Sequence, residues 1–214
     1  MTSERKPIVL VASTVYHYEE LLERIYSLLT SFGYEVWMSH KGTPPVSSNL
    51  SNLENCRMAV EKCDLFLGII THEYGTGIID DGLSITHHEF RRAIELKKPR
   101  WVLAHDHVFF THTFLKELGF SGNDGRKKLT QPKKPILDLR TLEIFEDATV
   151  ADVDYKDRMG NWIQKYTTIP DAMLFATAQF SRYQEAEEFI REHFGNPYEV
   201  TKKIAETREA GHGD

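Results

Sequence analysis

The chain has 214 residues, enough for one α/β domain of ordinary size with a small appended segment but too few for two full domains. Hydrophobic residues make up 41% of the chain and charged residues 27%, a balance that excludes a disordered or fibrous protein. The net charge of −6 argues against a general nucleic-acid binder, because neutralising phosphates requires a basic face.

The first half of the chain alternates predicted strands with predicted helices. Short apolar segments predict strands at Ile8–Ser13, Glu35–Met38, Leu65–Ile70 and Arg100–Ala104. Between these strands, apolar residues recur at helical spacing and predict helices over Tyr18–Phe32, Leu53–Lys62 and Ile85–Lys97. Two of the strands are too apolar to have a face in water. We therefore expect a Rossmann-like α/β fold of flavodoxin order, with a parallel sheet and helices on both faces.

The second half of the chain is less regular. It predicts a helix over Val108–Leu118, a loop over Phe120–Pro135, a strand over Ile136–Phe145 and a long amphipathic helix over Pro170–Phe194. The loop contains a basic cluster around Arg126 that has the composition of a solvated surface segment. The expected organisation is an α/β domain at residues 5–150, a helical extension at residues 151–197 that packs on it, and a polar tail at residues 198–214.

Polar side chains and glycines gather where ligands bind in open parallel sheets, outside the carboxyl ends of the strands. With flavodoxin order, this crevice lies between the first and third strands. Small hydroxyl residues and glycines let backbone amides approach a phosphate or ribose, and a helix N-terminus adds positive potential. The residues expected to bind a nucleotide in this way are Ser13 and Thr14 after the first strand, Thr71, Tyr74 and Gly75 after the third, and Ser84 at the start of the next helix.

Glu89 lies one turn into the helix that begins after Ser84, and its side chain can point into the same crevice. A glutamate in a first turn more often complements the helix dipole and stays solvated, so position alone leaves both interpretations open. The sequence shows no second unambiguous acid beside Glu89. Asp80 and Asp81 are close to it, but an Asp-Asp-Gly segment is more typical of a turn.

Two resemblances bear on Glu89. Ser84–Pro99 (SITHHEFRRAIELKKP) resembles the helix that carries the catalytic glutamate in nucleoside 2-deoxyribosyltransferases, with Glu89 at the matching position. Residues 8–104 as a whole resemble a TIR-like domain family of uncharacterised function, found in bacterial defence and NTPase-repeat proteins. The segments that carry this resemblance include Ala12-Ser13-Thr14, Asp64 before LFLGII, Tyr74-Gly75, and Gly82–Thr86 before Glu89. The sequence departs from these patterns at His87-His88 and at Thr71–Tyr74.

The resemblance implies cleavage of the N-glycosidic bond in a nucleoside or dinucleotide, with Glu89 as nucleophile or as the anion that stabilises positive charge on the sugar. NAD is the expected substrate, because nicotinamide leaves as a neutral molecule without a general acid. No separate cofactor is expected. The resemblance also implies a role in bacterial anti-phage defence, and since toxic NAD loss must be gated, we expect a homo-oligomer. Two alternatives stay open: a non-catalytic TIR-like module for signalling, nucleotide binding and self-assembly, and a nucleoside 2-deoxyribosyltransferase.

Histidines and cysteines are the remaining candidates for chemistry. His105, His107 and His112 follow the fourth strand, but no His-Glu-x-x-His motif and no ligand-spaced cysteine or acid accompanies them, so no metal site is expected. Cys56 and Cys63 fall on an apolar helical stripe and are expected to be packed thiols too far apart to bridge. With no signal sequence and no apolar run long enough for a membrane span, we expect a cytoplasmic protein without membrane contact.

Overall fold

The computed structural model describes residues 5–75, 77–79, 81–130, 137–151, 153–158 and 161–183. Its strands form a single sheet in the order β2-β1-β3-β4-β5, and every neighbouring pair is parallel. This is the flavodoxin order, so the predicted α/β fold class is confirmed. The strands are β1 (Ile8–Ser13), β2 (Glu35–Trp37), β3 (Leu65–Ile70), β4 (Arg100–His105) and β5 (Asn161–Tyr166).

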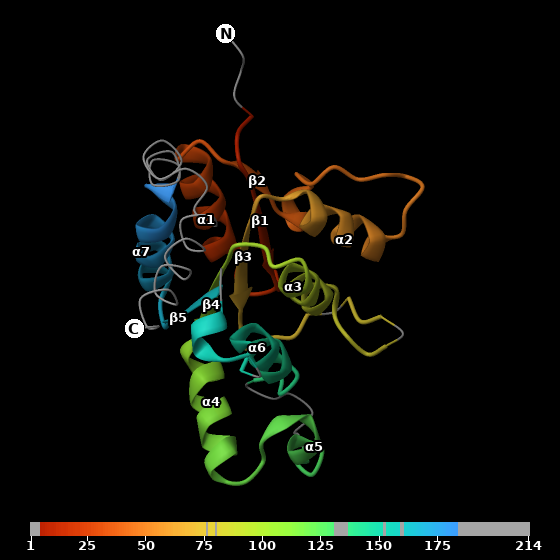
Figure 1. Ribbon diagram of the computed structural model, residues 1–214, viewed down its shortest axis with the longest axis vertical. Coiled ribbons are helices and arrows are strands. Elements are labelled where there is room, and N and C mark those ends of the chain that lie inside the picture. The colour runs from red at the N-terminus through yellow and green to blue at the C-terminus, as the bar shows by residue number, and fades with distance from the viewer. Residues whose placement is uncertain are drawn as a thin grey trace, which may run out of the picture. The chain divides into compact units, whose positions relative to one another are not determined.

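Helices cover both faces of the sheet, with α1 on one side and α2 and α3 together on the other (Figure 1). The helices are α1 (Glu19–Ser31), α2 (Asn52–Lys62), α3 (Ile85–Glu95), α4 (Asp106–Glu117), α5 (Gly122–Arg126), α6 (Thr141–Thr149) and α7 (Ile169–Phe180). Short 3-10 turns occur at Ser39–Lys41 and Tyr155–Asp157. In the part of the chain that the structure describes, none of these helices combines the length and apolarity that crossing a bilayer demands.

The core forms where the two central strands meet the helices on either side. All six residues of β3 are buried, and in β1 only the last residue is partly exposed. Ser51 starts α2 with a capping box: its Oγ accepts from the Glu54 amide at 3.2 Å, and the Glu54 carboxylate accepts from the Ser51 amide at 2.8 Å. This cap fixes where α2 begins and therefore which of its side chains face the sheet.

Gly68, in the middle of β3, lets α3 lie close to the sheet. A Cβ atom on Gly68 would stand 2.2 Å from Cζ of Phe90, whose ring packs edge-on against Phe66 with 5.3 Å between ring centroids. Phe90 is 1% exposed, so its ring fills the space that a side chain at Gly68 would need. The absence of a side chain at Gly68 thus determines how closely α3, the helix that carries Glu89, approaches the sheet.

The predicted strand over Ile136–Phe145 is wrong, because residues 141–149 form helix α6. The backbone carbonyl of Asp138 accepts hydrogen bonds from the amide and the hydroxyl of Thr141, at 2.9 and 2.8 Å, and turns the chain into the helix. Thr141, Phe145 and Ala148 are then buried at helical spacing. The fifth strand is instead β5, which pairs with β4 and lies within residues 151–197, where a helical extension and no strand was expected.

The predicted loop over Phe120–Pro135 contains the short helix α5, and Arg126 at its end is not solvated. Its guanidinium is buried and donates to both carboxylate oxygens of Glu146 in α6, at 2.7 and 2.8 Å. A lysine could not make two parallel hydrogen bonds to one carboxylate. The arginine therefore joins α5 to α6 more firmly than a lysine would. Residues 131–136 lie outside the described residues.

The chain divides into two compact units, residues 1–173 and 174–214. Helix α7 begins at Ile169 in the first unit and ends at Phe180 in the second. The remainder of the helix predicted over Pro170–Phe194 extends past residue 183, outside the described residues, as does the predicted tail at 198–214. The boundaries of the helical extension and its packing on the α/β domain therefore stay predictions.

Candidate functional site

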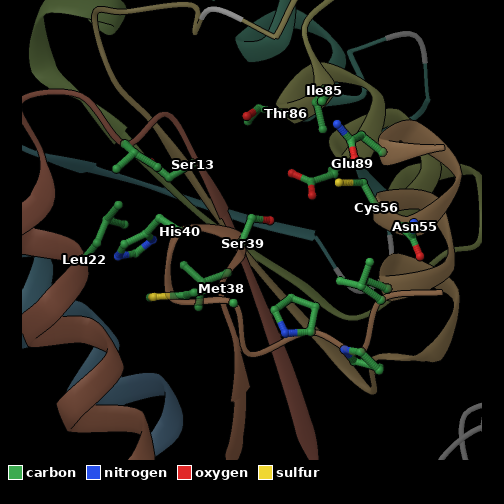
Figure 2. A pocket seen from close by; sticks show the side chains of 18 residues that line it. Ser13, Leu22, Met38, Ser39, His40, Asn55, Cys56, Ile85, Thr86 and Glu89 are labelled. Carbon is green, nitrogen blue, oxygen red and sulfur yellow. The ribbon is translucent and has the colours of Figure 1, made fainter. Parts of the chain in front are cut away.

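A cavity of about 320 Å³ lies at the carboxyl ends of β1 and β2. Ser13, Leu22 and His40 line one side of it, and Cys56 and Glu89 line the other (Figure 2). Most of the remaining lining is apolar. Of the described residues that line the cavity, Glu89 is the only acid, and none is a lysine or arginine. The charge of the cavity therefore favours a neutral or cationic ligand group over a phosphate.

Glu89 reaches this cavity because of where α3 begins. Ser84 Oγ accepts a hydrogen bond from the His87 amide at 3.2 Å and caps the helix, which places Glu89 one turn in, on the face that is buried. Glu89 is 5% exposed, and its carboxyl group points into the cavity (Figure 2). No lysine, arginine or histidine of the described chain forms an ion pair with it.

Burial raises the pKa of Glu89 to about 8, and a hydrogen bond from the Cys56 thiol acts in the opposite direction. A carboxyl group with this pKa is mostly protonated at pH 7 in the free protein. A cation bound beside it would favour the carboxylate and lower that pKa. Glu89 is therefore poised to ionise when a positively charged group enters the cavity, and perturbed carboxyl groups in clefts are characteristic of functional sites.

Cys56 lies beside Glu89 in the cavity wall rather than packed in the core (Figure 2). Burial raises the pKa of its thiol to about 12, and the neighbouring Glu89 carboxylate adds to this rise. Since the thiolate is the nucleophilic form of cysteine, this thiol is unreactive at neutral pH and serves as a hydrogen-bond donor. Cys63 is buried in the core as expected, and both cysteines are free.

Several polar side chains of the cavity were not predicted from the sequence, among them His40 in the loop after β2 and Asn55 in α2, which holds that loop. Burial and the adjacent Lys41 lower the pKa of His40, which keeps its imidazole neutral. Asn55 holds the loop: its Oδ1 accepts from the Ser47 amide at 2.8 Å, and its Nδ2 donates to the carbonyls of Ser47, Leu50 and Ser51 at 3.1 Å. The signal in the sequence was the Gly- and Pro-containing loop at the carboxyl end of a strand.

Three of the predicted binding residues hold the loop after β3 and do not line the cavity. Thr14 Oγ1 and Thr71 Oγ1 both donate to the backbone carbonyl of Glu73, at 2.9 and 3.1 Å. Gly75 has a φ of +93°, a backbone conformation that favours glycine, and a Cβ there would lie 3.6 Å from Thr14 Oγ1. Of the predicted binding residues, Ser13 alone joins Glu89 in the cavity lining.

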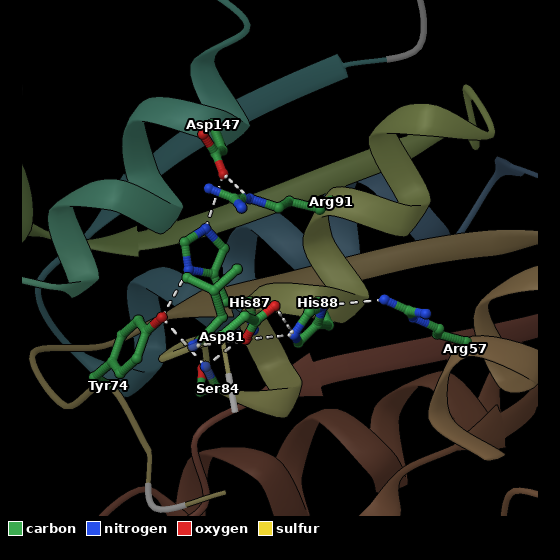
Figure 3. A network of polar contacts seen from close by, with 9 residues as sticks. Arg57, Tyr74, Asp81, Ser84, His87, His88, Arg91 and Asp147 are labelled. Carbon is green, nitrogen blue, oxygen red and sulfur yellow. Dashed lines mark hydrogen bonds and ion pairs between the residues drawn. The ribbon is translucent and has the colours of Figure 1, made fainter. Parts of the chain in front are cut away.

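Tyr74 and Ser84 belong to a separate polar network (Figure 3). The Tyr74 hydroxyl accepts from the Ser84 amide at 3.2 Å and lies 2.8 Å from Nδ1 of His87. His87 Nε2 is 2.8 Å from Asp147 in α6, and Arg91 Nε donates to the same carboxylate oxygen at 2.6 Å. Tyr74 and His87 are buried, so this network ties the loop after β3 and the start of α3 to α6.

The comparison with known families agrees with the extent of this fold. The sequence matches the family described as a domain of unknown function (DUF4062) over residues 8–160, a range that contains β1 to β4, the cavity and the polar network. No curated protein matches the sequence. Because the match covers well over half of the chain, the protein belongs to the DUF4062 family.

Proposed function

We propose that this protein is a nucleotide N-glycosidase that cleaves the bond between base and ribose, with NAD as its substrate. The observation that carries the proposal is the Glu89 carboxyl group, which is buried, has no cationic partner in the described chain and points into a cavity at the carboxyl edge of the sheet. The resemblance of the helix around Glu89 to that of nucleoside 2-deoxyribosyltransferases supports the same role for this glutamate.

The size and charge of the cavity favour the nicotinamide riboside half of NAD. About 320 Å³ is at the lower end of the range of ligand pockets, so the cavity suits one nucleoside unit while the adenylate half extends outside. The nicotinamide ring carries a positive charge, which complements a lining with one carboxyl group and no described lysine or arginine. The hydroxyls of Ser13, Ser39 and Thr86 are available in the lining to bind ribose.

The proposed reaction needs one carboxylate. When the bond between C1′ and the ring nitrogen breaks, its electron pair stays on nicotinamide, which leaves as a neutral molecule. The positive charge moves to the ribose, where ionised Glu89 stabilises it or bonds to C1′. Water then attacks C1′, displaces Glu89 as the carboxylate where a bond to C1′ has formed, loses its proton to solvent and yields ADP-ribose. The protonated Cys56 thiol donates a hydrogen bond to the Glu89 carboxylate and helps to keep it oriented.

The test is incubation of the purified protein with NAD, followed by chromatography for nicotinamide and ADP-ribose over a range of protein concentrations. Glu89→Gln should lower the rate by about 100-fold or more, because it removes the charge that stabilises the transition state. Glu95→Gln, on the exposed end of the same helix, is the matched control and should cleave NAD normally. No release of nicotinamide at any concentration, or an undiminished rate in Glu89→Gln, would contradict the proposal.

The main alternative is a non-catalytic module that binds a nucleotide and self-assembles. Only ionised Glu89 can stabilise positive charge on the ribose. A Glu89 that kept its raised pKa and stayed neutral in the complex would therefore bind the nucleotide without cleaving it. Binding of NAD without turnover would identify such a module. A nucleoside 2-deoxyribosyltransferase would instead release base from a deoxynucleoside only when an acceptor base is supplied.

The biological part of the proposal is a role in bacterial anti-phage defence, through loss of NAD in a self-associated state. It rests on the resemblance to the TIR-like family rather than on any contact in the fold. Infecting cells that express the chain or Glu89→Gln and measuring NAD would test it. Equal NAD levels in the two strains after infection would remove this part of the proposal and leave the biochemical part standing.

A further inference from the structure

Three histidines meet at the carboxyl edge of the sheet, away from the Glu89 cavity. His72 follows β3 by two residues, His105 is the last residue of β4, and His107 is in the first turn of α4. Because β3 and β4 are parallel neighbours, their carboxyl ends lie side by side and bring these residues together. One ring nitrogen from each histidine lies within 4.8 Å of the other two. None of the three lines the Glu89 cavity.

We infer that His72, His105 and His107 form a binding site for one divalent transition-metal ion, with Zn²⁺ as the reference ion. Imidazole nitrogens are ligands that Zn²⁺, Cu²⁺ and Ni²⁺ accept. At a Zn–N distance of about 2.0–2.1 Å, tetrahedral ligand nitrogens lie roughly 3.3 Å apart. The nitrogens of this cluster therefore need to approach by roughly 1.5 Å at most. Ring rotations supply a movement of that size without a change in the backbone.

The second nitrogens of two of these rings already have partners. His72 Nδ1 is 2.5 Å from the Tyr18 hydroxyl. His105 Nδ1 accepts a hydrogen bond from the His107 amide at 3.3 Å and lies 3.0 Å from Asp106 Oδ1. Metal-binding histidines characteristically have a hydroxyl, carbonyl or carboxylate at the nitrogen that does not bind the metal, which fixes the tautomer and the ring. With Nδ1 of His72 engaged by Tyr18, Nε2 of His72 is the nitrogen available to the ion. His105 can bind the ion through Nε2 once its proton moves to Nδ1, which exchanges the hydrogen bond from the His107 amide for one to Asp106.

Two buried oxygens beside the cluster support the same site. Asp106 Oδ1 and Tyr166 Oη are the buried side-chain oxygens without a hydrogen-bond partner in the part of the chain that the structure describes. Asp106 Oδ1 is close to His105 Nδ1 but not in hydrogen-bond geometry, and a rotation of the ring toward the ion would correct this. The Tyr166 ring packs edge-on against His105, with 5.2 Å between centroids. Buried polar oxygens of this kind call for an explanation, and a nearby ion or its bound water supplies one.

The cluster is open to solvent on one side, since His72 and His105 are half-buried and His107 is exposed. Three protein ligands with an open position are typical of catalytic or ligand-exchanging metal sites rather than closed structural ones. The fourth position is then available to water or to an anionic group such as a phosphate or carboxylate.

The experiment uses the untagged full chain, freed of metal with a chelator and titrated with Zn²⁺ by calorimetry. Bound Co²⁺ gives a visible absorption spectrum that reports a nitrogen-rich site independently. We expect one ion per chain and a rise in melting temperature on adding Zn²⁺. His107→Ala changes an exposed side chain, and His105→Asn keeps an N-cap for α4, so both variants should fold.

Each of these substitutions should weaken Zn²⁺ binding at least about tenfold, since even partners outside the ligand shell contribute that much. His112→Ala is the matched control on the same helix, because His112 lies apart from the cluster, 3.4 Å from Glu146. Glu89→Gln should also bind Zn²⁺ normally. Equal Zn²⁺ affinity in His107→Ala, His112→Ala and the unchanged chain would overturn the inference, as would the absence of a one-to-one complex.

Discussion

The carboxyl group of Glu89 and the thiol of Cys56 face the same cavity, and each shifts the pKa of the other. Helices α3 and α2, which carry them, pack against each other on one face of the sheet. Burial shifts both groups toward their protonated forms. The charge of Glu89 is thus the property of this site that changes within the neutral pH range.

Replacing Glu89 with glutamine should stabilise the fold at neutral pH. The pKa of Glu89 is about 8 in the folded chain against an ordinary 4.5, so between these values the folded state holds a proton that the unfolded state has lost. Stability from this group is complete below about pH 4.5 and falls as the pH rises through about 8. Because glutamine does not ionise, Glu89→Gln should keep up to about 3 kcal/mol of the free energy of unfolding that the unchanged chain loses at pH 7.

Denaturant unfolding at pH 5 and pH 8 measures this effect. The advantage of Glu89→Gln over the unchanged chain should be larger at pH 8 than at pH 5. Glu95→Gln, at the exposed end of the same helix, should show no such trend. An advantage that is the same at both pH values would mean that Glu89 is not a buried neutral acid.

The rate of NAD cleavage should rise with pH. The reactive form of Glu89 is the carboxylate, and kcat/KM reports the ionisation of the free enzyme, so it should increase about tenfold per unit below pH 8 and level off above. The inflection of the kcat–pH profile should occur at a lower pH than that of kcat/KM, because the cationic ring of bound NAD favours ionised Glu89. Steady-state kinetics between pH 6 and 9 would test both profiles, and a flat kcat/KM would count against ionisation of Glu89.

Tyr74→Phe should lower the free energy of unfolding without changing KM for NAD. The substitution leaves the Ser84 amide and His87 Nδ1 without the partner they have in the network, and unpaired buried groups cost about 1–3 kcal/mol each. Tyr74 does not line the cavity, so KM for NAD should be unchanged. Tyr155→Phe at an exposed tyrosine is the control. A raised KM with unchanged stability would instead place Tyr74 against the substrate, as the sequence suggested.

Glu146→Ala should destabilise the fold more than Arg126→Met. Removing the carboxylate leaves the buried Arg126 guanidinium without its bidentate partner, which costs about 3 kcal/mol. Methionine at position 126 removes the charge but keeps much of the volume, and Glu146 remains accessible to water. Urea unfolding of both variants would measure the order, with Asp124→Ala in an exposed ion pair as control. The reverse order would show that the pair is not buried as described.

Three of the first four strands, β1, β3 and β4, lie inside the sheet, and burial makes their sequences easy to recognise. A strand covered on both faces must be apolar, as in β1 and β3, and its residue pattern alone identifies it. β5 is at the edge and half exposed, with Trp162 56% exposed, so its mixed composition resembles that of a loop. The residues of α6 contain both alternation and helical spacing, and the turn at Asp138 decides between them.

The candidate site was predicted only in part. Glu89 and Ser13 follow from the topology of the sheet and the family resemblance, and both line the cavity. Tyr74 has a hydroxyl that can serve a ligand or its own chain, and no local pattern distinguishes these uses. The histidine cluster combines His72 with His105 across two strands, whereas chain order grouped His105 with His112. Such partnerships arise from tertiary contacts, which spacing along the sequence does not encode.

The close approach of Gly68 to Phe90 has a consequence for how related chains can diverge. Phe90 directly follows Glu89 in α3. The contact of its ring with the backbone at Gly68 therefore fixes the position of Glu89 as well as that of the helix. A homologue with alanine in place of that glycine would have to shift the helix outward and, with it, the acid. Divergence in what such proteins recognise can therefore begin in the interior, while every residue at the ligand's surface stays the same.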